Sequence, residues 1–247
     1  MLSDLQLPND SLNSLGKYAD DNSLCAPLFK NCSNDHILKD HNHIVDWSKR
    51  NELPLNENKC KSLTISSSKR LHGVTIPGVL DVDELKLLGV IFCSDISRPW
   101  KVHIDSIVKR ASSRLYCLRI LKPFFNVDLL HDVYFGLIRS ILEYCSVLFV
   151  GTKACDLNRL DMIQRRAHRI MHGGNCNKNC LPTLESRRFT AARKFVTAAL
   201  NPSNIVNHLL PRKSSSSRNN KTRFLLDSAN TKRRLESTIP FTCTYLQ

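Results

Sequence analysis

Two adjacent carboxylates, Asp20 and Asp21, follow Tyr18 and Ala19 near the start of the chain. Apolar segments lie on both sides, which predicts two short strands joined by a tight turn with both aspartates at its tip. Two neighbouring acids repel each other unless a cation neutralises them, and oxygen ligands of this kind suit Mg²⁺. Two-metal phosphoryl transfer in polymerases depends on such carboxylates. The alternative is an ordinary Asp-Asp turn without a metal ion.

Further sequence blocks follow this stretch in a fixed order. They are Asp46-Trp47 and the segments 51–60, 87–92, 100–104, 142–145, 164–170 and 184–188. Together with Tyr-Ala-Asp-Asp at 18–21, this ordered series resembles the reverse transcriptase of non-LTR retrotransposons, of the jockey-like LINE group. The resemblance runs from about Asp4 to the end, and it covers the end of the palm, the thumb and the region after it.

The resemblance implies that Asp20 and Asp21 are catalytic residues that hold Mg²⁺ in a weak, incomplete site, because the family's other metal-binding aspartate lies well upstream. It implies that Lys59 assists the pyrophosphate leaving group and that Tyr18 and Gly89 contact nucleic acid. A solvated lysine and a plain turn or bulge glycine are the alternatives. We therefore expect a truncated RNA-directed DNA polymerase that is inactive alone, unless a second chain supplies the missing palm and fingers. The alternative is a host-adopted basic helical module that binds nucleic acid or another partner without catalysis.

Positive charge is concentrated in the second part of the chain. Residues 1–100 hold 11 Lys and Arg against 13 Asp and Glu, whereas residues 101–247 hold 25 against 9, so the net charges are −2 and +16. This asymmetry indicates a polyanionic partner, namely RNA, DNA or an RNA–DNA hybrid. The alternatives are a merely soluble basic surface and a ribosomal or membrane-surface preference.

The basic side chains expected to contact phosphates lie on predicted helices. They are Lys101, His103, Lys109, Arg110, Arg114 and Arg119 on or near the first, Arg165, Arg166 and Arg169 on the third, and Arg187, Arg188, Arg193 and Lys194 on the fourth. In the family that the chain resembles, this region grips the template–primer duplex.

A second metal pattern is present in the helical region. His168, His172, Cys176 and Cys180 follow one another at intervals of four residues, which is compatible with a tetrahedral zinc site. The Cys-x₃-Cys spacing is uncommon for zinc, and Gly173-Gly174 separates the pairs, so we expect no zinc here. The ten scattered cysteines indicate reduced thiols in an intracellular protein, nuclear or cytoplasmic. No segment reaches the roughly 20 apolar residues of a membrane span, so no membrane partner is expected.

The elements that would position these residues form an α+β chain. A partial palm over 1–97 is expected to contain a hairpin within 12–28, a helix from Ser33 or Asn34 to about Arg50, and strands at 59–66, 74–76 and 85–92. The helix is expected to cover one face of a small antiparallel sheet.

A helical thumb-like bundle is expected over 98–200. Its apolar stripes predict one helix from Trp100 to Pro123, one over 130–148, one ended by Gly173-Gly174 and one from about Thr183 to Leu200, packed antiparallel. Residues 201–247, with their serine run and scattered basic residues, are expected to form a flexible basic tail.

Overall fold

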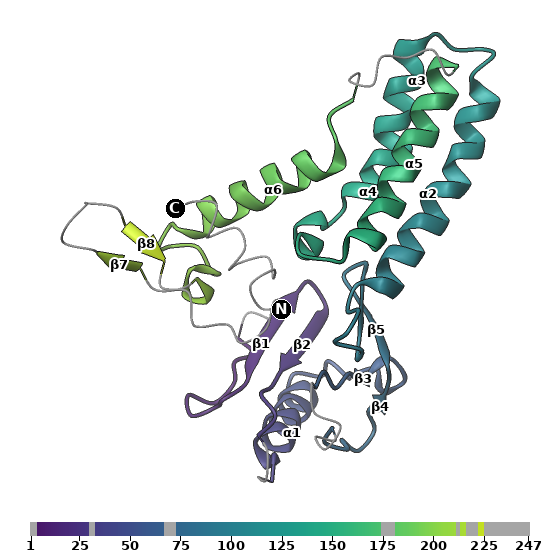
Figure 1. The fold of residues 1–247 in the computed structure, drawn as a ribbon. Helices are drawn as coiled ribbons and strands as arrows, with labels where there is room; N and C mark the ends of the chain where they lie inside the picture. The colour runs from purple at the N-terminus through teal and green to yellow at the C-terminus, as the bar shows by residue number, and fades with distance from the viewer. Residues whose placement is uncertain are drawn as a thin grey trace. The chain divides into compact units, whose positions relative to one another are not determined.

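The chain contains helices and two-stranded β-sheets and is therefore an α+β protein, as the sequence predicts (Figure 1). The computed structural model describes residues 4–29, 33–66, 73–173, 181–210, 213–215 and 222–224. The chain divides into two compact units, Met1–Pro99 and Trp100–Gln247. Small sheets and one long helix make up the described part of the first unit, and helices dominate the second.

The predicted hairpin forms from β1 (Ser14–Tyr18) and β2 (Asp21–Cys25), which pair antiparallel. Its turn has two residues, Ala19 and Asp20, and Ala19 takes the left-handed conformation with φ 53°. A two-residue turn with positive φ follows the natural twist of the flanking strands. Asp20 therefore lies at the tip, whereas Asp21 is already the first residue of β2.

One amphipathic helix, α1 (Asp35–Arg50), packs on this hairpin. The buried cluster consists of Leu5, Ile44 and Trp47, with the cross-strand pair Leu15 and Leu24 packed against it. Asp40 is buried on the same helix and accepts hydrogen bonds from the Ser11 hydroxyl and, at 2.7 Å, from Nδ2 of Asn13. These bonds tie the start of the hairpin to the helix, so helix-on-sheet packing is present here.

The remaining strands of the first unit differ from the sequence prediction. The strand expected over 59–66 contains only β3 (Lys61–Ser62), which pairs in parallel with β4 (Leu80–Asp81). Residues 74–76 form no strand. Among the described residues every sheet has two strands, so the expected single layer is not formed.

The segment expected as one strand over 85–92 is a hairpin of β5 (Glu84–Leu87) and β6 (Val90–Cys93). Leu88 and Gly89 make its turn, with φ of 47° and 82°. Positive φ at both central residues is the geometry that favours glycine in two-residue hairpins. The turn was not predicted from the sequence because leucine, at the first of these positions, is not a typical turn-forming residue.

Four helical segments of the second unit lie side by side in a bundle (Figure 1). They are α2 (Lys101–Leu121), α3 (Val127–Tyr134), α4 (Ser140–Glu143) and α5 (Ala154–His172). Their shared core includes Ile104, Ile107, Ala111, Leu115 and Leu118 from α2, Leu130, Tyr134, Ile138 and Leu142 from the next segments, and Leu160, Ile163, Ala167 and Met171 from α5. Spacings of three and four residues thus mark the core face, as predicted.

The single helix expected over 130–148 is interrupted twice. The segment η2 (Phe135–Arg139) is π-helical, and Cys145 takes φ 51° before the 3₁₀ turn η3 (Ser146–Phe149). Phe149 is fully buried by this change of direction, and its ring centroid lies 6.1 Å from that of Trp100. An aromatic contact at the start of α2 therefore takes the place of the last predicted helical turn.

The helix α6 (Leu184–Ala199) begins as predicted, because the Thr183 hydroxyl accepts a hydrogen bond from the Ser186 amide at 3.1 Å. Beyond it, the segment expected to be a flexible tail contains the 3₁₀ turn η4 (Asn207–Leu209) and two short strands. These strands are β7 (Lys213–Ser215) and β8 (Thr222–Phe224), which pair antiparallel. None of the described helices combines the length and the apolar composition that crossing a membrane requires.

Candidate nucleic-acid interface

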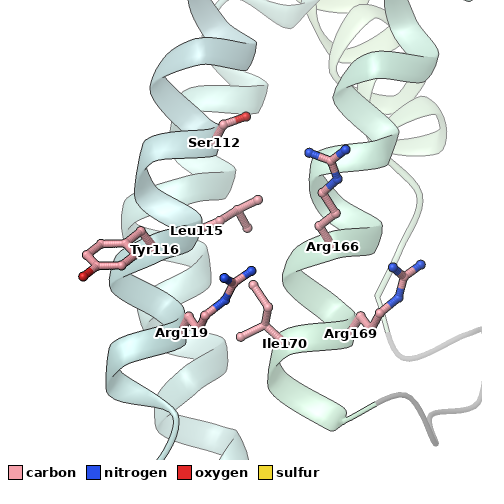
Figure 2. Close-up of a pocket in the computed structure, with 7 residues that line it drawn as sticks. All are labelled: Ser112, Leu115, Tyr116, Arg119, Arg166, Arg169 and Ile170. Atoms are coloured by element: carbon pink, nitrogen blue, oxygen red, sulfur yellow. The ribbon is translucent and has the colours of Figure 1, made fainter.

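A groove of about 480 Å³ runs between α2 and α5. It is lined by Ser112, Leu115, Tyr116, Arg119, Arg166, Arg169 and Ile170 (Figure 2). Leu115 belongs to the buried core and Ile170 packs against that core, so the floor of the groove is apolar. Figure 2 shows Arg119 extending from α2 toward α5, whereas the ring of Tyr116 turns away from α5.

Helical spacing brings these side chains together. On α2, Ser112, Leu115 and Arg119 fall at steps of three and four residues, and on α5 Arg166 and Ile170 are four apart. Residues at these steps share one side of a helix. The core beneath and an ion pair between Arg159 of α5 and Asp105 of α2 hold the two helices together. The groove therefore lies on two packed helices and not on loops.

The arginines of the groove have no acidic counterpart. Arg119, Arg166 and Arg169 are exposed, and within the described part of the chain no carboxylate forms an ion pair with any of them. A guanidinium offers a planar fork of donors that fits phosphate oxygens. The chemistry of the groove therefore suits the phosphate oxygens of a polyanion.

The other basic residues of α2 divide between two sides of the helix. Lys101, Lys109, Arg110 and Arg114 are all exposed. At 3.6 residues per turn, Lys101 lies on the same side as Arg119, about five turns earlier, and Lys109 lies roughly 80° around the helix from that side. Arg110 and Arg114 fall on the far side of α2. Of the basic residues predicted on α2, Arg119 lines the groove and these four do not.

Two further basic residues lie apart from the groove lining. Arg165 is exposed on α5, next to Arg166 in sequence but turned toward the outer side of the helix. His103 is buried and packs against Phe149, with ring centroids 5.7 Å apart. Burial, and secondarily the charge of Arg110, lower the pKa of His103 below 6.5. A neutral buried imidazole offers no charge to a phosphate.

Arg187 and Arg188 of α6, which were also predicted to contact nucleic acid, do not line the groove. Arg187 binds Glu143 with two hydrogen bonds, one of them 2.7 Å from Nη2 to Oε2, and Arg139 reaches the same carboxylate at 2.9 Å. Arg188 is only 4% exposed, and burial lowers the pKa of its guanidinium. Arg187 is therefore already paired with an acid of the second unit, and Arg188 is buried within it.

The carboxylates of the first unit lie at an open hairpin tip. Asp20 and Asp21 are exposed, and Tyr18, which faces Asp21 across the ladder, is 66% exposed. Among the described residues, no group of three or more His, Cys, Asp and Glu side chains is arranged to hold a metal ion. Mg²⁺ favours six oxygen ligands, so two carboxylates on one turn leave most of the shell to water or to other groups.

Lys59 and Gly89 occupy turns of the first unit. Lys59 ends the 3₁₀ turn η1 (Glu57–Lys59) and not a strand, because its amide bonds the Asn56 carbonyl at 2.9 Å. Its side chain is exposed. Gly89 provides the positive φ of the β5–β6 turn, which matches the simpler interpretation of this glycine.

The predicted histidine–cysteine pattern is described only in part. His168 and His172 lie one turn apart on α5, with ring centroids 4.6 Å apart. Cys176 and Cys180 lie outside the described residues.

Sequence reasoning missed Tyr116, which is 65% exposed beside the groove. The sequence feature that could have identified it is an aromatic residue three positions before Arg119 on a helix rich in basic residues. Exposed aromatics interleaved with arginines are typical of surfaces that stack on nucleic-acid bases or sugars. The sequence also did not indicate that Arg119 and Arg166 line the same groove, because only the packing of α2 on α5 places them there.

No protein-family model, curated protein or solved structure matches this chain.

Proposed function

We propose that the helical unit binds the backbone of nucleic-acid duplexes, RNA–DNA hybrids included, with little sequence preference. The observation that carries this proposal is the α2–α5 groove, in which Arg119, Arg166 and Arg169 are exposed and make no ion pair with a described acid. The net charge of +16 over residues 101–247 supports the same partner class. Phosphate contacts position a protein on a duplex but carry no sequence information.

The resemblance to non-LTR reverse transcriptases extends this proposal to the whole chain. It assigns the helices to a thumb that grips template and primer, and the β1–β2 hairpin to the part of a palm that carries Asp20 and Asp21. We propose that this hairpin binds Mg²⁺ weakly. We also propose that Lys59 does not assist catalysis in these 247 residues by themselves.

Primer extension tests the enzymatic part. We expect no extension of a primer on an RNA template with Mg²⁺ or Mn²⁺, because two carboxylates cannot hold two metal ions against an incoming triphosphate. Extension by the purified chain that disappears in Asp20→Ala would contradict this. Extension that needs an added second chain would show that the two chains form the active site together.

Fluorescence anisotropy with a labelled RNA–DNA hybrid tests the binding part. Affinity should fall steeply between about 50 and 200 mM salt, with a slope of about 0.9 per phosphate contact on duplex DNA. Reversal of Arg165, Arg166 and Arg169 to Glu should weaken binding to hybrids and DNA duplexes of unrelated sequence alike. Removal of residues 201–247 should lower affinity only in part if the helices carry the contacts.

A second candidate function is an interaction module without a nucleic-acid role. It is favoured by exposed apolar side chains around the end of α2, where Ile120 is 48% and Phe124 78% exposed. Exposed apolar patches often mark protein-binding surfaces. Absence of binding to any duplex at low salt would make this the better account.

A further inference from the structure

Three histidines meet at the seam between α3 and α5, a different side of α5 from the groove. His131 comes from α3, and His168 and His172 come from successive turns of α5. Nε2 of His131 lies 3.1 Å from Nε2 of His172, and the two ring centroids are 5.1 Å apart. Nε2 of His168 is buried and has no hydrogen-bond partner in the described structure.

We propose that His131 and His172 form a two-imidazole site for a divalent transition-metal ion of the zinc class. Zinc–nitrogen bonds are about 2.0–2.1 Å long, so two nitrogens 3.1 Å apart reach one ion with an angle of about 100° between the bonds. That angle is close to tetrahedral. Water completes the shell in the arrangement as it stands.

His168 is not arranged as a ligand in the structure, but rotation of its ring would bring a third nitrogen to the ion. It lies four residues before His172, a spacing that puts two imidazoles on one side of a helix and serves zinc in other proteins. Its buried nitrogen gains a partner when the ring turns toward the ion, which removes the cost of an unsatisfied polar group. This ligand set does not use Cys176 or Cys180.

One positive charge beside the seam limits the affinity of the site. Lys122, at the end of α2, lies close enough to act electrostatically on His172. The ammonium of Lys122 opposes a second positive charge, so Lys122→Met should tighten metal binding.

A direct hydrogen bond between the two imidazoles is the competing explanation of the 3.1 Å contact. In that case one ring donates its Nε2–H and the other accepts. Such a pair needs no ion and gains nothing from adding one. The metal site does not depend on the proposed nucleic-acid function, and the two can fail separately.

Cobalt titration of the purified full chain under reducing conditions tests the site. We expect visible d–d bands that zinc displaces, without the near-ultraviolet charge-transfer band of thiolate ligation. The bands should be lost in His131→Asn and His172→Asn, weakened in His168→Asn, and kept in His208→Asn, an exposed histidine elsewhere. Circular dichroism of the metal-free variants checks that each one folds.

A readout on the unchanged chain covers the case in which a variant does not fold. Zinc should protect His131 and His172, but not His208, from acylation detected by mass spectrometry. Absence of a cobalt signal, or equal acylation with and without zinc, would overturn the proposal in favour of the hydrogen bond. A thiolate band lost in Cys176→Ser but retained in His131→Asn would also overturn it, and would place the ion on the four-residue repeat of histidines and cysteines.

Discussion

The two units differ in what holds their candidate chemistry in place. In the first, Asp20 and Asp21 lie at the exposed end of the β1–β2 hairpin, and the hairpin packs on a small cluster of Leu5, Ile44 and Trp47. In the second, the groove arginines project from two long helices whose shared core extends over most of their length. Functional groups on packed helices keep their geometry without a ligand, whereas acids on an open turn depend on other groups to fix an ion.

Among the predicted changes, a substitution in the core of the second unit should have the largest effect on the free energy of unfolding. Ile163→Ala removes a side chain that is 2% exposed in the main cluster, and should cost about 2–5 kcal/mol of unfolding free energy. Ile44→Ala, at 8% exposure in the smaller cluster of the first unit, should cost less because fewer neighbours surround it.

The two tryptophans allow each unit to be followed separately. Trp47 belongs to the first unit and Trp100 to the second, so denaturant unfolding in Trp47→Phe and Trp100→Phe backgrounds reports one unit at a time. Equal losses for both isoleucine variants would remove the contrast between the two cores.

An intermediate effect on stability is expected from Glu143 of the second unit, which is paired with two arginines. Burial raises the pKa of Glu143, but hydrogen bonds from Arg187 and Arg139 outweigh it and hold the pKa below 4.5. The stability that Glu143 contributes is therefore fully present above about pH 4.5 and is lost as pH falls through the folded-state pKa. Glu143→Gln should cost about 1–3 kcal/mol at neutral pH.

The same variant should reduce the loss of stability below pH 4.5, read from Trp100 fluorescence. Glu185→Gln, an exposed acid on the same helix as Arg187, is the matched control and should change little. If Glu143→Gln lost as much stability below pH 4.5 as the parent chain, other groups would control the acid unfolding of this unit.

The smallest effect is expected at the hairpin tip. Asp21→Asn should leave stability and duplex binding nearly unchanged, because this side chain is exposed and lies outside the groove. Calorimetry should detect only weak Mg²⁺ binding to the parent chain. Micromolar Mg²⁺ binding that Asp21→Asn abolishes would mean that the first unit holds a better-formed metal site than its geometry indicates.

Helical packing was more readable from the sequence than the sheets were. Ala111, Leu115 and Leu118 recur at helical spacing and do form the bundle core, because each repeat reports the same buried side. The π-helical segment Phe135–Arg139 left no such signal, since it alters the path of the helix within an unbroken apolar stripe. The turn at Leu88 was hidden because a leucine takes a position that usually requires glycine.

The composition of the candidate site was predictable, but its geometry was not. The sequence identified the basic helices, yet Arg187 and Arg188 are adjacent to each other and differ completely in exposure. Which arginines face a groove depends on the pairing of α2 with α5. That pairing is decided by the whole core and by contacts such as Arg159 with Asp105, which no local pattern reports.

Hybrid binding by two matched double variants tests the central claim most directly. Arg119→Gln with Arg166→Gln removes two charges from the groove, whereas Arg110→Gln with Arg114→Gln removes two charges from the far side of α2. Anisotropy titrations over a salt series should show weaker binding and a salt slope reduced by about 1.8 for the groove variant, at about 0.9 per contact. The far-side variant should retain nearly the full slope. Equal losses in both variants would contradict a groove-centred interface.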